Sequence, residues 1–148
     1  MSFISNTLGA AAWIAIAGSV LVILMSTRYG RLWPVSIAIV LTIAGTWILH
    51  HSDVAAYFWI ANVGVGITWA FVISYLLGMC SEFDSAGQMA ALGGFASKMG
   101  LASGPLVGAL LVGEDNYAVL INIACVALLI GMAVIVLPAF SLDKQKSV

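Results

Sequence analysis

The sequence predicts an all-α membrane protein, a polytopic transmembrane bundle of about five spanning helices. Of the 148 residues, 63% are hydrophobic and only 7% are charged, against about 45–50% and about 25% in ordinary soluble domains. A soluble domain of this length leaves roughly 30% of its chain surface in water, and this chain has too few polar side chains to cover that surface. A bilayer removes the difficulty because lipid tails solvate apolar side chains.

The lengths of the apolar stretches support the same fold class. At 1.5 Å per helical residue, each stretch makes a helix of about 27 Å or more, which suits a hydrocarbon core of about 30 Å. The polar connections are short, so we expect consecutive helices to be antiparallel neighbours in one domain. The five expected spans are residues 8–25, 32–49, 54–80, 89–112 and 117–137, followed by a tail over residues 138–148.

The basic residues predict the orientation. Arg28 and Arg31 lie in the first connection, and Lys144 and Lys146 lie in the tail. Five crossings place both segments on one side of the membrane, and basic residues favour the cytoplasmic side. We therefore expect a multi-pass protein of the cell membrane with its N-terminus outside. An uncharged N-terminus on that side is unusual, so we also expect a further helix upstream in a longer protein.

The sequence argues against several classes of function. The net charge is −1 and the chain has only five Lys and Arg, so no basic patch can neutralise nucleic-acid phosphates. Cys80 and Cys125 have no second Cys or His at metal-ligand spacing, and we expect free buried thiols. The sequence arranges no nucleophile with a base, no phosphate-binding loop and no metal cluster. We therefore expect neither catalysis nor a cofactor.

Small residues mark one face of the stretch 89–112. They recur every three or four residues and let another helix approach closely, so we expect a helix-packing face. Pro105 removes one backbone hydrogen bond and is expected to bend this helix just past its middle. The face consists of Gly93, Ser97, Gly100, Gly104 and Gly108.

Lys98 is the only Lys, Arg, Asp or Glu deep within an expected span. It lies roughly 15 Å from the cytoplasmic end of its helix, too far for its side chain to reach the headgroups. An ammonium group in lipid costs at least about 2.5–3.5 kcal/mol, so we expect Lys98 to face a hydrated cavity or a partner carboxylate. The alternative is a lysine bonded to backbone carbonyls of a broken helix. A substrate or coupling role is favoured because intramembrane ionisable residues are usually functional.

A second set of residues shares one face of the stretch 54–80. This face predicts a cavity wall, with an amide and an aromatic ring beside a gap left by glycine. It consists of Asn62, Gly66, Trp69 and Ile73, which recur at helical spacing. The alternative is helix packing, in which Asn62 bonds to a neighbouring helix. In the connection that follows, Glu82 and Asp84 either cap the next helix or pair with the arginines of the first connection.

The first connection resembles a signature of the major facilitator superfamily of transporters. Residues 27–31, Thr-Arg-Tyr-Gly-Arg, are similar to the second copy of that family's cytoplasmic loop, in which an Asp-Arg-x-Gly-Arg core joins two helices. Arg28, Gly30 and Arg31 match the core, whereas Thr27 stands in place of the aspartate.

A second segment supports this resemblance. Residues from Asp84 to Gln88, with the small-residue helix that contains Ser103-Gly104-Pro105, are similar to the loop and the eleventh helix of bacterial members. Gln88 stands where arginine is frequent. By this resemblance the five helices correspond to the eighth to twelfth of a twelve-helix carrier in a bacterial inner membrane, and the chain is a partial C-terminal half.

The resemblance implies secondary transport of a small-molecule solute, bound near mid-membrane between two six-helix halves. Lys98 and the face of Asn62, Gly66 and Trp69 would line the substrate pathway. The basic turn would belong to a cytoplasmic latch, which Thr27 deprives of its acidic partner. The missing N-terminal half, or self-association, is expected to complete the cavity.

Another function is compatible with the same residues. The main alternative is a small non-transporting membrane protein that assembles with partner helices through its glycine face. A channel is disfavoured because the sequence has no ring of like charges and no repeated carbonyl filter.

Overall fold

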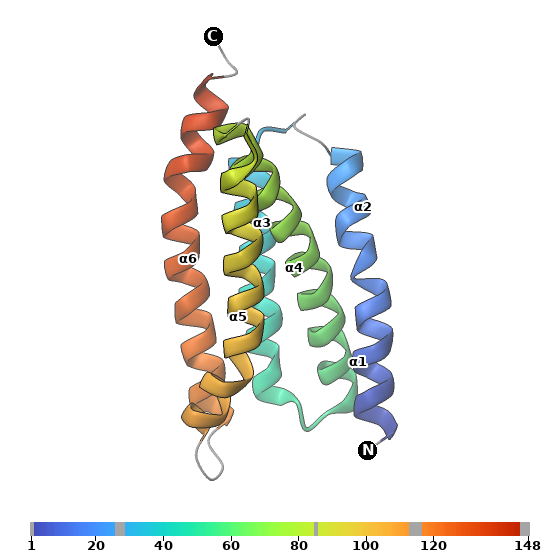
Figure 1. Cartoon of the computed structure of the whole chain (residues 1–148). Helices are drawn as coiled ribbons and strands as arrows, with labels where there is room; N and C mark the ends of the chain where they lie inside the picture. The colour runs from blue at the N-terminus through green and yellow to red at the C-terminus, as the bar shows by residue number, and fades with distance from the viewer. Residues whose placement is uncertain (1, 26–28, 85, 113–116, 146–148) are drawn as a thin grey trace.

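The expected all-α bundle is confirmed. The computed structural model describes residues 2–25, 29–84, 86–112 and 117–145, and these segments are helical apart from short turns. The helices lie side by side along one common direction (Figure 1). They are α1 (Ser2–Ile14), α2 (Ile16–Met25), α3 (Leu32–Ile48), the 3-10 helix η1 (Leu49–His51), α4 (Ala55–Phe83), α5 (Gln88–Val112) and α6 (Tyr117–Gln145).

Four helical stretches of the described chain are long and apolar enough to cross a bilayer, judged by length and composition: Ile4–Met25, Leu32–His51, Ala55–Phe83 and Tyr117–Lys144. The helix α5 has 25 residues, but it is not one of the four. The mean hydropathy of α5 is lowered by Lys98 and by the many glycine and serine residues of this helix. It nevertheless packs against α4 and α6 and runs beside them in Figure 1. The fourth expected span is therefore a helix of the bundle, with the weakest apolar character.

The central helix is α4, which packs against α1, α2, α3 and α5, while α6 packs mainly against α3. Lipid tails are as apolar as the side chains, so close packing and interhelical hydrogen bonds hold such helices together. The Thr42 hydroxyl of α3 donates to the Thr68 hydroxyl of α4 at 2.7 Å. The core beside this bond is formed by Val35, Ala38, Ile39, Phe71 and Tyr75.

Among the described glycines, the one with the least space for a side chain lies outside the predicted stripe. A Cβ at Gly18 would lie 2.1 Å from the Ile67 carbonyl oxygen and 3.0 Å from the Phe71 amide nitrogen. Gly45 of α3 also lies close to α4, but with a longer contact, because a Cβ there would lie 3.0 Å from Val65 Cγ2. Small residues therefore bring α2 and α3 onto α4.

The helix α6 is longer than the expected span. It continues through Pro138 to Gln145, so residues 138–145 of the expected tail are helical. Proline costs one helical hydrogen bond, but the extension carries Asp143 back to the start of α3, where it bonds to two backbone amides. The ends of α2, α4 and α6 and the starts of α3 and α5 thus lie at one end of the bundle (Figure 1).

Candidate functional site

The basic turn before α3 depends on a glycine. Gly30 has a φ of +72°, a left-handed conformation that glycine adopts without steric cost. A Cβ at this position would also lie 2.9 Å from Asp143 Oδ2. Conformation and space therefore both favour glycine immediately before Arg31. Arg28, the other predicted basic residue of the turn, lies outside the described residues.

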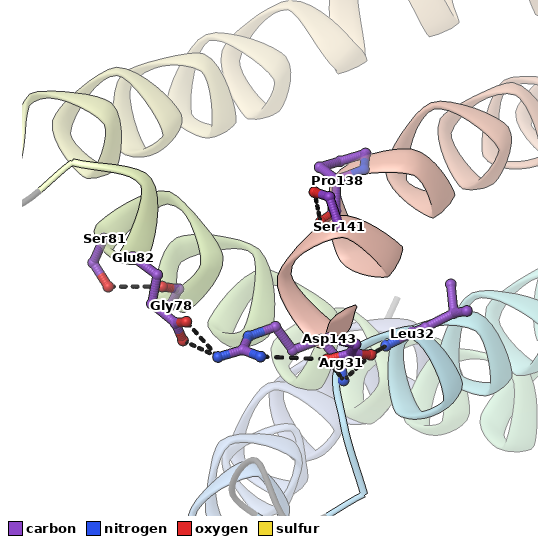
Figure 2. Close-up of polar contacts among 8 residues, drawn as sticks. All are labelled: Arg31, Leu32, Gly78, Ser81, Glu82, Pro138, Ser141 and Asp143. Carbon is purple, nitrogen blue, oxygen red and sulfur yellow. Dashed lines mark hydrogen bonds and ion pairs between the residues drawn. The ribbon is translucent and has the colours of Figure 1, made fainter. Parts of the chain in front are cut away.

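Arg31 forms the centre of a charged cluster at this end of the bundle. Its side chain is only 2% exposed. Nη2 donates to both carboxylate oxygens of Glu82 on α4, and Nη1 donates to Asp143 Oδ1 on α6 at 3.3 Å. Figure 2 shows the guanidinium between the two carboxylates. Hydrogen bonding to Glu82 raises the pKa of Arg31, and Asp143 adds to this against the opposing effect of burial.

Asp143 also caps α3 from a different helix. It accepts from the Arg31 amide at 2.9 and 2.8 Å and from the Leu32 amide at 2.9 Å. The first amides of a helix lack intrahelical acceptors, and a carboxylate there also interacts favourably with the helix dipole. Asp143 was not predicted from the sequence. The available signal was charge balance, because an arginine buried at the start of an apolar helix needs carboxylates.

Glu82, in the last turn of α4, and Asp84, directly after α4, each take one of the two expected roles. Glu82 pairs with Arg31. The Asp84 carboxylate accepts from the amides of Ala86 at 2.9 Å, Gln88 at 2.8 Å and Met89 at 3.2 Å, and so caps α5. These backbone hydrogen bonds, that from Ala86 first, hold the pKa of Asp84 below its usual range.

An apolar groove of about 620 Å³ lies between α4, α5 and α6, within the range of about 300–1,000 Å³ found for ligand pockets. Trp69 of α4, 46% exposed, forms part of one wall. Gly93, Ser97 and Gly100 of α5 form part of the opposite wall, and Pro138 of α6 lies beside them. The groove is therefore built mainly by apolar side chains and by the gaps that glycine leaves.

The other two residues of the predicted cavity wall do not line this groove. The Asn62 side chain turns back on its own helix and donates to the Phe58 carbonyl at 2.7 Å. Gly66 faces the end of α1, where a Cβ would lie 3.5 Å from the Ala11 carbonyl oxygen and 3.4 Å from the Cβ of Ala15, which follows α1. Of the predicted face, Trp69 and Ile73 border the groove.

Lys98 lies on the exposed side of α5. Ser97, immediately before it, and Leu101, almost one turn after it, both line the groove. Within the described segments no carboxylate pairs with Lys98, since both ion pairs there belong to Arg31. Lys98 itself is not a wall residue, and it lies at the edge of the groove without a described counter-ion.

The predicted glycine face of α5 is covered at its two ends only. A Cβ at Gly93 would lie 3.2 Å from Cys80 Sγ, and one at Gly108 would lie 4.0 Å from Leu120 Cδ1. At Gly100 and Gly104 the same atom would meet nothing within 4 Å. Ser97, between Gly93 and Gly100, borders the groove. The middle of the face is therefore open.

The described residues hold no group of three His, Cys, Asp or Glu able to bind a metal ion. Cys80 and Cys125 are free, the first half-buried and the second buried. Two regions are therefore candidates for a functional site. One is the charged cluster at one end of the bundle, in which Arg31 is paired with carboxylates, and the other is the open groove beside Lys98, which has no described counter-ion. Comparison with protein-family models, curated proteins and solved structures finds no match to this chain.

Proposed function

We propose that this protein acts in secondary transport of a small solute across a membrane, as part of the second half of a major facilitator type carrier. The observation that carries the proposal is the position of Lys98. It lies near the middle of a helix, beside a groove of ligand size, and no described carboxylate neutralises it. An ammonium group at such depth is costly unless water, a solute or a partner meets it.

The Arg31 cluster supports the same function. Alternating access requires contacts at one end of a bundle that can form and break. The cluster, made of Arg31, Glu82 and Asp143, ties three helices together at one end, and its acidic members remain 38% and 25% exposed. Water can therefore replace their ion pairs when the helices separate. Arg31 and the preceding Gly30 are also two of the residues that match the loop signature of the major facilitator superfamily.

The test is solute counterflow in liposomes that contain the purified chain. Solutes are first screened for an increase in the melting temperature of the protein, because a ligand that binds only the folded state stabilises it. We expect a stabilising solute to exchange across the membrane, the Lys98→Met variant to lose exchange, and the Lys98→Arg variant to retain part of it. Equal counterflow in wild type and Lys98→Met would contradict the proposal.

A second function is favoured by the open middle of the glycine face. Gly100 and Gly104 have room for another helix, as expected for a non-transporting protein that assembles with partners. In that case Gly104→Leu would change the mass of the complex in detergent, whereas no stabilising solute would exchange in liposomes. Loss of counterflow in Lys98→Met without a change in mass favours the carrier.

A further inference from the structure

The acidic residues of the described chain are all committed elsewhere or lie far from Lys98 along the helices. Glu82 and Asp143 pair with Arg31, and Asp84 caps α5. Asp53 lies in the turn between η1 and α4, and this turn is at the opposite end of the bundle from the start of α3 (Figure 1). Charge compensation for Lys98 must therefore come from outside the described part of the bundle.

The groove next to Lys98 has an apolar wall. Its polar side chains are the Ser97 hydroxyl, the Cys80 thiol and the Trp69 indole N–H. None of the groove residues is acidic, so nothing in the wall opposes an anion. Lys98 is not itself a wall residue, but it follows Ser97 and lies three positions before Leu101, both of which are. Residues three apart are neighbours on a helix surface, and the lysine stem is long and flexible enough to extend toward that edge of the groove.

From this juxtaposition we infer that the groove binds an amphiphilic organic carboxylate, with its apolar body against Trp69 and its carboxylate at Lys98. This substrate class rests on the proposed transport function and makes it specific. Organic cations are disfavoured by the like charge of Lys98. Sugars and polyols are disfavoured because the wall has too few polar groups to replace their hydrogen bonds to water.

Two other sources of negative charge fit the site less well. In a second copy of this chain, the described carboxylates lie at the same ends of the helices and have the same partners, so none of them compensates Lys98 in a dimer. A phospholipid phosphate lies at the membrane surface, whereas Lys98 is roughly 15 Å along its helix. A mobile carboxylate that enters the groove meets neither restriction.

The test compares two ligands that share one apolar body, pyrenebutyrate and the neutral pyrenebutanol. The full chain is placed in nanodiscs of phosphatidylcholine, and binding is followed by energy transfer from tryptophan to pyrene, with protein-free nanodiscs as the lipid blank. We expect the carboxylate to bind about tenfold more tightly than the alcohol, as one hydrogen bond to a charged group supplies.

Three variants assign this preference. Lys98→Met should bind both ligands equally, whereas Lys98→Arg should retain the preference. Lys144→Gln removes the same charge outside the groove and should also leave the preference unchanged. Equal binding of the two ligands by wild type would show a site for neutral apolar molecules and overturn the inference. An unchanged preference in Lys98→Met would overturn it as well.

Failure of this inference differs from failure of the proposed function. A Lys98-dependent preference with no counterflow of any bound carboxylate supports the anion site and contradicts the carrier. Counterflow of a neutral or cationic solute, with no carboxylate preference, contradicts the anion site and supports the carrier.

Discussion

Two cations of the described chain, Arg31 at one end of the bundle and Lys98 within α5, have opposite surroundings. The Arg31 side chain is 2% exposed and has two carboxylate partners from two other helices. Lys98 is exposed, and no described residue pairs with it. A buried charge with good partners can be part of the folded structure, whereas an unpaired one in a membrane is costly. Arg31 is therefore compensated within this chain, whereas Lys98 has no described counter-ion, which is why the proposed ligand site is placed at Lys98.

The glycine residues show the same division of the molecule. At Gly18 the backbone of α4 fills the space that a side chain would need, whereas the space beside Gly100 and Gly104 is open. At Gly18, the packing of α2 against α4 therefore leaves no space for a side chain. The middle of α5 is left available for a ligand or a partner helix.

Replacement of Arg31 and replacement of Lys98 should change the free energy of unfolding differently. We expect Arg31→Met to lower the free energy of unfolding by about 3 kcal/mol, because Glu82 and Asp143 are left close together without a counter-ion. Lys98→Met should cost little or increase stability, because it removes an uncompensated charge. Unfolding in mixed detergent micelles measures both variants, and equal losses would remove the distinction between the two regions.

The glycine contrast predicts the next largest effect. Gly18→Ala should cost about 2 kcal/mol, because its Cβ would overlap the Ile67 carbonyl oxygen and the helices must move apart. The matched control, Gly104→Ala, meets no atom within 4 Å and should be neutral or gain up to about 1 kcal/mol from higher helix propensity. A similar loss in both variants would show that the α5 face is also closed.

A smaller effect is expected from the residue that joins α6 to α3. Asp143→Asn keeps the size and one acceptor oxygen but loses the charge, so we expect a loss of about 1 kcal/mol. The control is Ser141→Ala, because the Ser141 hydroxyl is exposed and donates only to the Pro138 carbonyl of its own helix. In a double-mutant cycle, Arg31→Met and Asp143→Asn should be non-additive. Additive losses would separate the cap from the ion pair.

The helices could be predicted because apolar length and polar breaks are local properties of the sequence. The Arg31–Asp143 contact could not, because its members are 112 positions apart and meet only if α6 continues through Pro138. The prediction of the glycine face of α5 was limited in a similar way. Spacing identifies small residues on one side of a helix, but it does not show whether a neighbour fills the space beside Gly100. The role of Glu82 could be narrowed to two alternatives, and three-dimensional proximity to Arg31 decided between them.

The smallest predicted effect concerns Asp84, a carboxylate compensated by backbone amides and not by a cation. Because those amides lower its pKa in the folded state, its contribution to stability is present above its unfolded value of about 3.9. The contribution is lost as the pH falls through the lower folded pKa. We expect the amide chemical shifts of Ala86 and Gln88 to titrate together with a midpoint below about 3.9, and to stop titrating in Asp84→Asn. A midpoint above that value would show that the cap does not persist in the membrane, and that the start of α5 is as open as its middle.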